Sequence, residues 1–180
     1  MTWIITHTGQ RFELLQPAAA MIHPADIAHS LAHLCRFNGH THEHYSVAQH
    51  CYIASTLVPK EDALAALLHD APEAYIGDMV RPLKQVMPAF KAIEENIWVA
   101  ICERFNLPTE LPASVHQVDM LMLGIERRDL MPAHPDEWEC LAGIELPAAH
   151  IRPWAAIEAR THYFNRLMDL MATTHRANAA

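Results

Sequence analysis

Glycine is scarce in this sequence, and the common phosphate-binding and hydrolase motifs are missing. The 180 residues include 5 Gly, and neither G-x-x-x-x-G-K-[ST] nor G-x-G-x-x-G occurs. The nucleophile motif G-x-S-x-G is absent as well. The zinc motif H-E-x-x-H fails because Ser46 stands where the second histidine after His42-Glu43 would be needed. These absences exclude the P-loop, the dinucleotide fingerprint, the nucleophile elbow and the HExxH metal site.

Long apolar runs and C-x-x-C pairs are also lacking. No stretch reaches the roughly 18 apolar residues that span a bilayer, and the first residues lack the pattern of a signal peptide. We therefore expect a cytoplasmic protein with no membrane contact.

The cysteines lie in or beside apolar helical runs, where a free cysteine usually acts as a small buried hydrophobe. They are Cys35, Cys51, Cys102 and Cys140.

Basic residues are outnumbered, with 13 Lys+Arg against 21 Asp+Glu and a formal net charge of -8. Such a surface repels polyanions, so a nucleic acid polymer is not an expected partner. A small phosphorylated ligand stays open, because a few arginines in a cleft can outweigh the overall field locally.

The pattern of apolar residues predicts a single all-α domain over 1–180 with a short N-terminal β-hairpin at 1–15. Hydrophobic residues make up 51% and charged residues 19%, as in a compact globular chain. The segment 131–153 holds four prolines and is expected to be an irregular crossing segment with a short helix near 138–142. Helical spacing and capping signals predict helices at 26–37 (capped by Asp26), 46–58 (capped by Ser46), 60–69, 88–105, 113–130 and 154–172.

Histidine is unusually abundant, with 14 residues, and His, Asp and Glu crowd together between His40 and Asp78. This is the side-chain chemistry of a metal site. The pair His69-Asp70 ends an otherwise apolar helix, where burial of both groups unpaired would be costly and a cation would offset that cost. A capped helix end with a hydrogen-bonded histidine explains the dipeptide alone equally well.

Three stretches extend this pattern: CRFNGHTHEHYSVAQH (35–50), LLHDAPEAYIGDMVRPLK (67–84) and VDMLMLGIERRDL (118–130). With them the sequence resembles the HD-domain metal-dependent phosphohydrolases, in particular short 5'-deoxynucleotidase-like members, including a prophage-encoded type. The resemblance covers most of the chain and implies a helical HD-domain bundle with its core at 26–130. It also implies four metal ligands, His50, His69, Asp70 and Asp119. Such a set suits one divalent ion of Mn, Co, Fe, Ni or Zn, and tolerates Mg.

The same resemblance implies roles for residues around the metal. Glu73 is expected to be the general acid/base, and Asp78 to lie over the sugar and leaving group. Arg36 is expected to bind phosphate, with Lys84 adding charge and His40 at the substrate rim. Plain structural roles remain open for each of these five: a helix N-terminal carboxylate, a turn residue, or surface cations and a loop histidine.

The activity implied is hydrolysis of a nucleotide phosphate ester, most of all 5'-deoxynucleoside monophosphate to deoxynucleoside and phosphate. Alternatives are a dNTP triphosphohydrolase or another phosphoesterase on the same site, and a non-catalytic metal or nucleotide sensor. A metal buffer using His40, His42 and His44 would hold more than one ion. The many apolar helix faces are compatible with a homo-oligomer.

Two further expectations concern residues outside these motifs. Arg127 and Arg128 are expected to pair with Glu126 and Asp129, or to cover apolar surface with their stems. A pocket for the base has no position fixed by the sequence, and the residues considered for it are Trp3, Met21 and Ile22.

Overall fold

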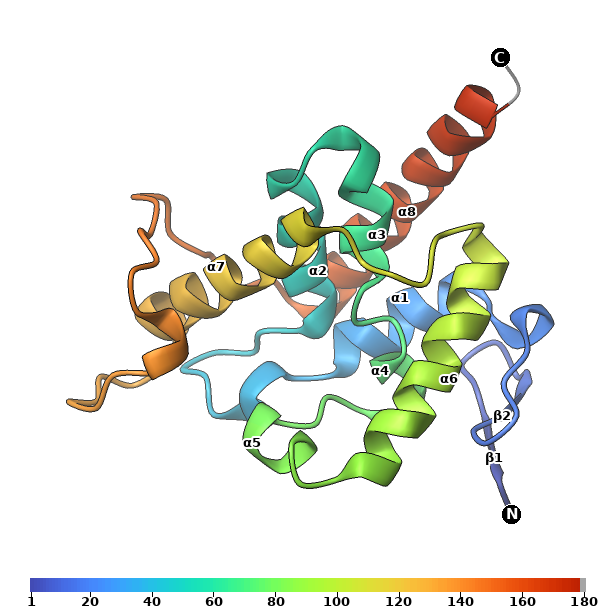
Figure 1. Ribbon diagram of the computed structural model, residues 1–180, viewed down its shortest axis with the longest axis horizontal. Helices are drawn as coiled ribbons and strands as arrows, with labels where there is room; N and C mark the ends of the chain where they lie inside the picture. Colours follow the sequence, from blue (N-terminus) through green and yellow to red (C-terminus); the bar gives the residue numbers. More distant parts are fainter. Residues whose placement is uncertain (179–180) are drawn as a thin grey trace.

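The computed structural model describes residues 1–178, with side chains described for 1–173, and it is mostly helical with one hairpin (Figure 1). Strands β1 (Trp3–Ile5) and β2 (Arg11–Glu13) pair antiparallel, with Ile4 opposite Phe12. The longer helices are α1 (Pro24–His33), α2 (Val47–Leu57), α6 (Pro88–Phe105), α7 (Ala113–Leu130) and α8 (Ala156–Asn178). The shorter ones are α3 (Ala63–Leu68), α4 (Glu73–Ile76) and α5 (Arg81–Lys84). The expected mostly helical fold with an N-terminal hairpin is confirmed.

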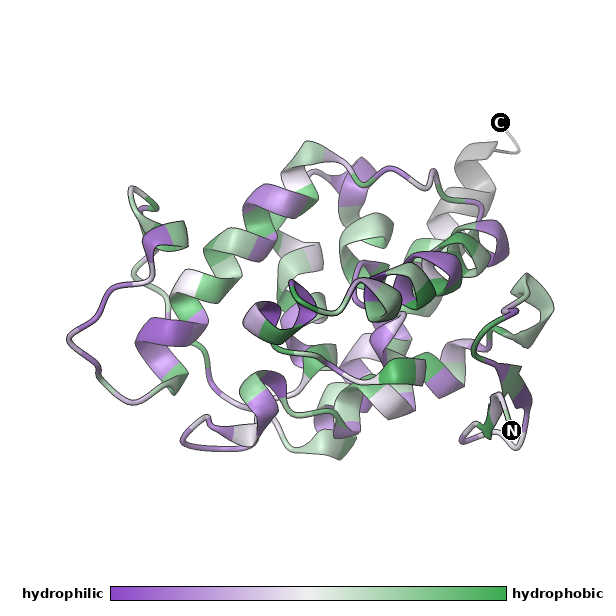
Figure 2. Ribbon diagram, turned by 60° about the horizontal axis from the view of Figure 1, so that its bottom comes forward, coloured by the Kyte–Doolittle hydropathy of each residue, from purple (hydrophilic) through white to green (hydrophobic). Residues whose placement is uncertain are grey.

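Helix α2 lies in the middle of the molecule and packs against α1, α3, α7 and α8. The main core gathers fully buried apolar side chains from the hairpin and most of the helices, and Tyr163 of α8 donates a hydrogen bond of 2.9 Å to the carbonyl of Leu67. Hydrophilic and hydrophobic residues alternate along the outer helices (Figure 2), as expected for elements that bury one face. No helix among residues 1–178 is both long and apolar enough to cross a bilayer.

Proline and serine signals placed several helix ends correctly. Helices α6 and α7 have the predicted bounds, and α6 begins with Pro88 in its first turn. Ser46 caps α2 by accepting a hydrogen bond of 3.2 Å from the backbone N–H of Gln49. The crossing segment has the expected short helical turn, at Glu139–Leu141.

The first helix differs from the prediction. It begins at Pro24, with His23 as the cap, and ends at His33 rather than near residue 37. The helix ends there because Leu34 and Cys35 adopt extended backbone angles, with ψ of 119° and 128°, and Cys35 forms a β-bridge with Ser46. Asp26 is not the cap, since its buried carboxylate accepts hydrogen bonds from the N–H and hydroxyl of Thr8 and fastens the hairpin to α1.

Two short helices that the sequence did not predict, α4 and α5, follow the third predicted helix. The expected helix at 60–69 consists of a 3₁₀ turn, Lys60–Asp62, followed by α3. Helix α4 then places Glu73 at its first position, and Gly77 ends it with a φ of 84° that favours glycine. The resulting turn directs the chain through Asp78 into α5.

Candidate functional site

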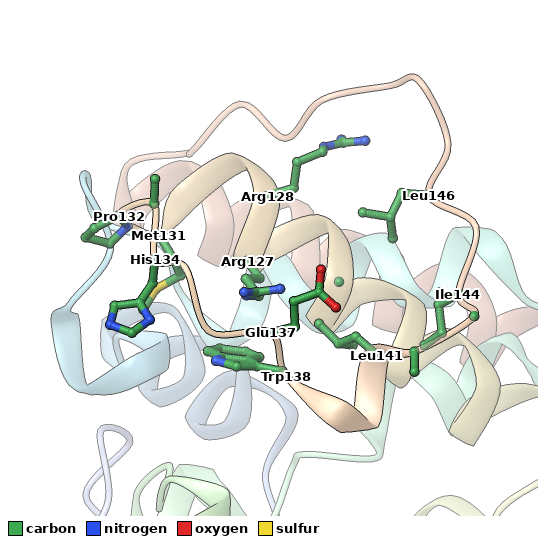
Figure 3. A pocket seen from close by; sticks show the side chains of 14 residues that line it. Arg127, Arg128, Met131, Pro132, His134, Glu137, Trp138, Leu141, Ile144 and Leu146 are labelled. Atoms are coloured by element: carbon green, nitrogen blue, oxygen red, sulfur yellow. The ribbon is translucent and has the colours of Figure 1, made fainter.

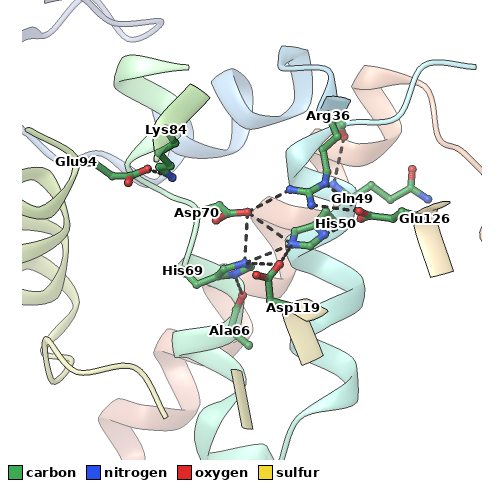
Figure 4. A network of polar contacts seen from close by, with 11 residues as sticks. Arg36, Gln49, His50, Ala66, His69, Asp70, Lys84, Glu94, Asp119 and Glu126 are labelled. Atoms are coloured by element: carbon green, nitrogen blue, oxygen red, sulfur yellow. Dashed lines mark hydrogen bonds and ion pairs between the residues drawn. The ribbon is translucent and has the colours of Figure 1, made fainter. Parts of the chain in front are cut away.

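Four polar side chains from three helical regions converge at one point (Figure 4). His50 comes from α2, His69 and Asp70 directly follow α3, and Asp119 comes from α7. The Nε2 atoms of His50 and His69 lie 3.3 Å apart, and Asp70 Oδ2 lies 3.6 Å and 3.3 Å from them. Asp119 Oδ1 is 3.4 Å from the first Nε2 and 3.8 Å from the second. Ligands bound at about 2.1 Å to one ion lie about 3.0–3.8 Å apart, so the spacing of this metal-ligand cluster fits a single metal ion.

Both imidazoles of the cluster point their Nε2 lone pairs at each other. The Nδ1 of His69 donates to the carbonyl of Ala66 at 2.8 Å, and that carbonyl can only accept. The Nδ1 of His50 donates to Oε1 of Glu126 at 2.7 Å. With both Nδ1 hydrogens committed, neither neutral ring carries a hydrogen on Nε2. Two lone pairs and two carboxylates therefore face one another, an arrangement that needs a cation between them, either a metal ion or protons.

The pKa shifts of the cluster reflect the same concentration of negative charge. Burial lowers the pKa of His50 and His69, but neighbouring carboxylates raise it more, so both lie above their usual value. Glu126 acts on His50, and Asp70 acts on His69. Burial raises the pKa of Asp119, yet the two imidazoles lower it far more, so it lies well below its usual range. The cluster thus attracts positive charge strongly.

Cys51 is the neighbour that sequence reasoning assigned only to the core. Its sulfur belongs, with donor atoms of His50, His69 and Asp70, to a group whose members all lie within 4.8 Å of one another. In the described part of the chain this is the one group of three or more metal-competent side chains so closely gathered. Burial raises the pKa of Cys51 to about 11, so the thiol is neutral in the metal-free protein. Cys102 is also buried, whereas Cys140 is exposed, contrary to the expectation for all four cysteines.

Glu126 is the functional residue that the sequence analysis missed. It was expected to pair with Arg127 or Arg128, but it is fully buried, and its Oε2 accepts hydrogen bonds from Nε and Nη2 of Arg36 at 3.2 Å and 3.1 Å. Its other oxygen holds His50. Arg128 pairs with Asp129 as expected. Glu126 follows Asp119 by seven residues, two turns of α7, so both reach the same side of the helix.

A cavity of about 740 Å³ opens over the metal-ligand cluster. All five residues expected around the metal line it, together with Asp70 and Asp119. They are Arg36, His40, Glu73, Asp78 and Lys84. Arg36 Nη1 lies 3.5 Å from Asp70 Oδ2, and Lys84 Nζ lies 2.6 Å from Oε1 of Glu94 on α6. We call this space the site cavity.

Glu73 is a buried carboxyl group with a free oxygen. It is 4% exposed, and its Oε2 has no hydrogen-bond partner. Burial raises the pKa of Glu73 well above its usual value, and the charges of Asp70 and Asp78 add to this effect. Burial likewise raises the pKa of Asp78, with Arg36 acting against it. Glu73 thus keeps its proton to a higher pH than an exposed glutamate, beside the metal-ligand cluster.

Several sequence candidates lie away from this site. His42 and His44 do not line the site cavity, and with His40 they do not form a metal-competent group among the described residues. His44 lies instead beside Cys35, with Nδ1 3.4 Å from the sulfur. Trp3, Met21 and Ile22, which were considered for the base, do not line the cavity either.

Comparison with known proteins gives this geometry a family context. The chain is 40% identical over 171 residues to the Escherichia coli (strain K12) protein named "Uncharacterized protein YfdR", covering 94% of this chain and 96% of the relative. The chain belongs to the YfdR family. It is also 37% identical over 123 residues, 63% of each chain, to "Uncharacterized protein RCAP_rcc00048" of Rhodobacter capsulatus. No protein-family model matches the chain.

The names of these two relatives state no activity. The HD-domain resemblance and the residue roles that it implies therefore stay predictions. The geometry of the site gathers two histidines, a cysteine and an aspartate into a group able to hold a metal ion.

Proposed function

We propose that this YfdR-family protein is an HD-domain phosphohydrolase that binds one divalent metal ion and converts 5'-deoxynucleoside monophosphates to deoxynucleosides and phosphate. The observation that carries the proposal is the pair of facing imidazoles, whose Nε2 atoms lie 3.3 Å apart while both Nδ1 atoms are fixed by acceptors. Histidines oriented in this way by a carboxylate and a carbonyl are typical of metal ligands. The nucleotide substrate rests on the sequence resemblance.

The expected ligands are His50, His69, Asp70 and Asp119, and this nitrogen and oxygen set suits Mn, Co, Fe, Ni or Zn, with Mg tolerated. When bound, such an ion supplies a Lewis acid for phosphoryl oxygens and acidifies water. Arg36, which borders the site cavity beside Asp70, binds and orients the phosphate. Water attacks phosphorus, the bond to the 5'-oxygen breaks, and that oxygen takes the proton held by Glu73, which is restored from the attacking water.

The charge around the site cavity favours a monophosphate over a triphosphate. Three cationic side chains line it, Arg36, Arg81 and Lys84, and two of them are already paired with Glu126 and Glu94. Four carboxyl groups line the same space, namely Asp70, Glu73, Asp78 and Asp119. A triphosphate carries more negative charge than this lining can neutralise.

The test is phosphate release and product mass for a panel of dNMPs, NMPs and dNTPs with Mn, Co, Mg or Zn. Asp70→Asn keeps the shape of the side chain but removes a metal ligand, so metal content by elemental analysis should fall from one per chain and turnover should vanish. Asp169→Asn, on the exposed face of α8, is the matched control and should change neither.

Three other results have distinct meanings. Full turnover by Asp70→Asn would refute the proposal. Tripolyphosphate from dNTPs would move the protein to the triphosphohydrolases. Metal and nucleotide binding with no turnover by the wild-type protein would identify a sensor.

A further inference from the structure

The site cavity has apolar as well as charged lining residues. Phe37, Leu123, Met131 and Trp138 line it together with the acidic groups and Arg36, whose guanidinium carbon lies 5.5 Å from the centre of the Phe37 ring. We propose that these four apolar side chains form a subsite in which Trp138 stacks on a planar aromatic ring of the ligand, with the phosphate held over the metal-ligand cluster. This aromatic subsite deepens the proposed function and rests on it for the phosphate end.

Trp138 is held in place by Arg127. The guanidinium carbon of Arg127 lies 5.3 Å from the centre of the Trp138 ring, and Arg127 Nη2 donates to the carbonyl of Asp136 at 2.6 Å. A cation over the indole restrains the ring before a ligand binds, so binding loses little side-chain entropy. The indole is therefore preorganised to bind a second planar group.

A second cavity of about 520 Å³ lies behind the aromatic subsite (Figure 3). Met131 and Trp138 line both cavities, so these two side chains separate them. Arg127 and Glu137 lie on the far side in this second cavity. Trp138 thus lies between the two cavities, with one side toward the cavity of the proposed ligand.

Phe37 supports the subsite at a backbone position that is unfavourable for an aromatic residue. Its φ of 54° and ψ of 33° lie in the left-handed region, which side chains with a Cβ rarely adopt. This conformation brings the ring centre to 6.2 Å from that of Trp138, with an angle of 40° between the planes. Backbone strain of this kind is concentrated at binding sites, which agrees with a ligand-binding role for the pair.

The chemistry of the lining predicts how bases are recognised. A cavity of about 740 Å³ is large enough for a nucleotide. The aromatic subsite offers ring faces, a thioether and an aliphatic chain, with Cys140 beside them, and few groups able to read the edge of a base. Stacking is tolerant of base identity because every base has a π face. We therefore expect broad acceptance of bases, with purines bound more tightly than pyrimidines.

The experiment compares two ligands that share the sugar and phosphate. Calorimetry measures the Kd of dAMP and of 2-deoxyribose 5-phosphate with Mn²⁺, on Glu73→Gln protein so that turnover is blocked. Adding Trp138→Ala should raise the Kd of dAMP about 5- to 150-fold and change that of the sugar phosphate less than twofold. Trp138→Phe should restore most of the affinity. Trp3→Ala, at the half-buried tryptophan of β1, is the matched control and should leave both values unchanged.

Equal loss for both ligands, equal loss in Trp3→Ala, or wild-type affinity in Trp138→Ala would each overturn the subsite, as would failure of the parent protein to bind dAMP. The proposed function is judged separately by turnover. Hydrolysis of dAMP with a Kd that does not depend on Trp138 would keep the phosphohydrolase and reject the subsite. Trp138-dependent dAMP binding without hydrolysis would do the reverse.

Discussion

The metal-ligand cluster and the crossing segment 131–153 border the same cavity but are held in different ways. Each cluster histidine is buried and fixed by a hydrogen bond from its own ring nitrogen. The crossing segment is mostly exposed, and Arg127 and Arg128 of α7 hold it through backbone carbonyls. We therefore expect substitutions in the segment to leave the two histidines in place, because the hydrogen bonds that fix them come from other parts of the chain.

The largest effect should come from removing the proton that Glu73 holds. Glu73→Gln keeps the shape of the side chain but cannot transfer a proton, so kcat should fall about 10²- to 10⁴-fold. Metal content and the Kd of dAMP should stay near wild type. A kcat within a few-fold of wild type in steady-state assays would remove Glu73 from the mechanism.

The next effect concerns the carboxylate behind the cluster. Glu126→Gln cannot accept hydrogen bonds from both His50 and Arg36, because one end of an amide is a donor. Metal affinity by calorimetry should fall about 10- to 100-fold, and the KM for phosphate esters should rise with it. Glu139→Gln, at an exposed position in the crossing segment, is the control. Unchanged metal affinity would show that the cluster does not depend on this support.

A pH-dependent stability difference should accompany Glu73→Gln in metal-free protein. The raised pKa of Glu73 means that the folded state binds its proton more tightly than the unfolded state. Wild-type stability from this group is present below the usual Glu value near 4.5 and is lost as pH rises toward the folded pKa. The Glu73→Gln variant lacks this loss of stability. Its Tm should therefore equal that of the wild type near pH 4 and exceed it by an amount that grows toward pH 8. A Tm difference that is constant with pH would contradict the burial argument.

The smallest effect should come from the contact between α7 and the crossing segment. A Cβ at Gly124 would lie 2.7 Å from Cδ2 of Leu146, so Gly124→Ala must displace that flexible side chain. The gain of about 1 kcal/mol in helix propensity should offset most of the packing loss, leaving Tm within a few degrees. The KM of dAMP should rise a few-fold while kcat and metal affinity hold. A loss of metal affinity instead would show that cluster and segment are not independent.

The sequence predicted those parts of the fold whose signals are local. Pro88 sets the start of α6, and Ser46 caps α2, so neither depends on distant contacts. The predicted end of α1 was wrong because Leu34 and Cys35 are extended, and Cys35 forms a β-bridge with Ser46, a contact that no local signal indicates. Aspartate commonly caps helices, but the carboxylate of Asp26 instead accepts hydrogen bonds from Thr8 of the hairpin turn.

The candidate site likewise contains residues that the sequence could predict and residues that it could not. His50, His69, Asp70 and Asp119 were expected from the resemblance to the HD-domain phosphohydrolases, and the structure brings them together. Glu126 was missed because it precedes Arg127 and Arg128, in a charged run typical of an exposed helix end. Its spacing of seven from Asp119 was the available signal. Trp138 lies in an irregular, proline-rich segment, where no periodicity indicates which side chains face a cavity.

The N-terminal hairpin packs against a part of the chain that is synthesised later. Phe12 of β2 is fully buried and stacks on Tyr75 at 3.8 Å between ring centres, and Tyr75 belongs to the short helix that begins with Glu73. Translation delivers β2 long before α4, so the Phe12 ring stays without its partner while the intervening helices are made. Docking of the hairpin and placement of the helix that carries Glu73 are therefore linked through the contact between Phe12 and Tyr75.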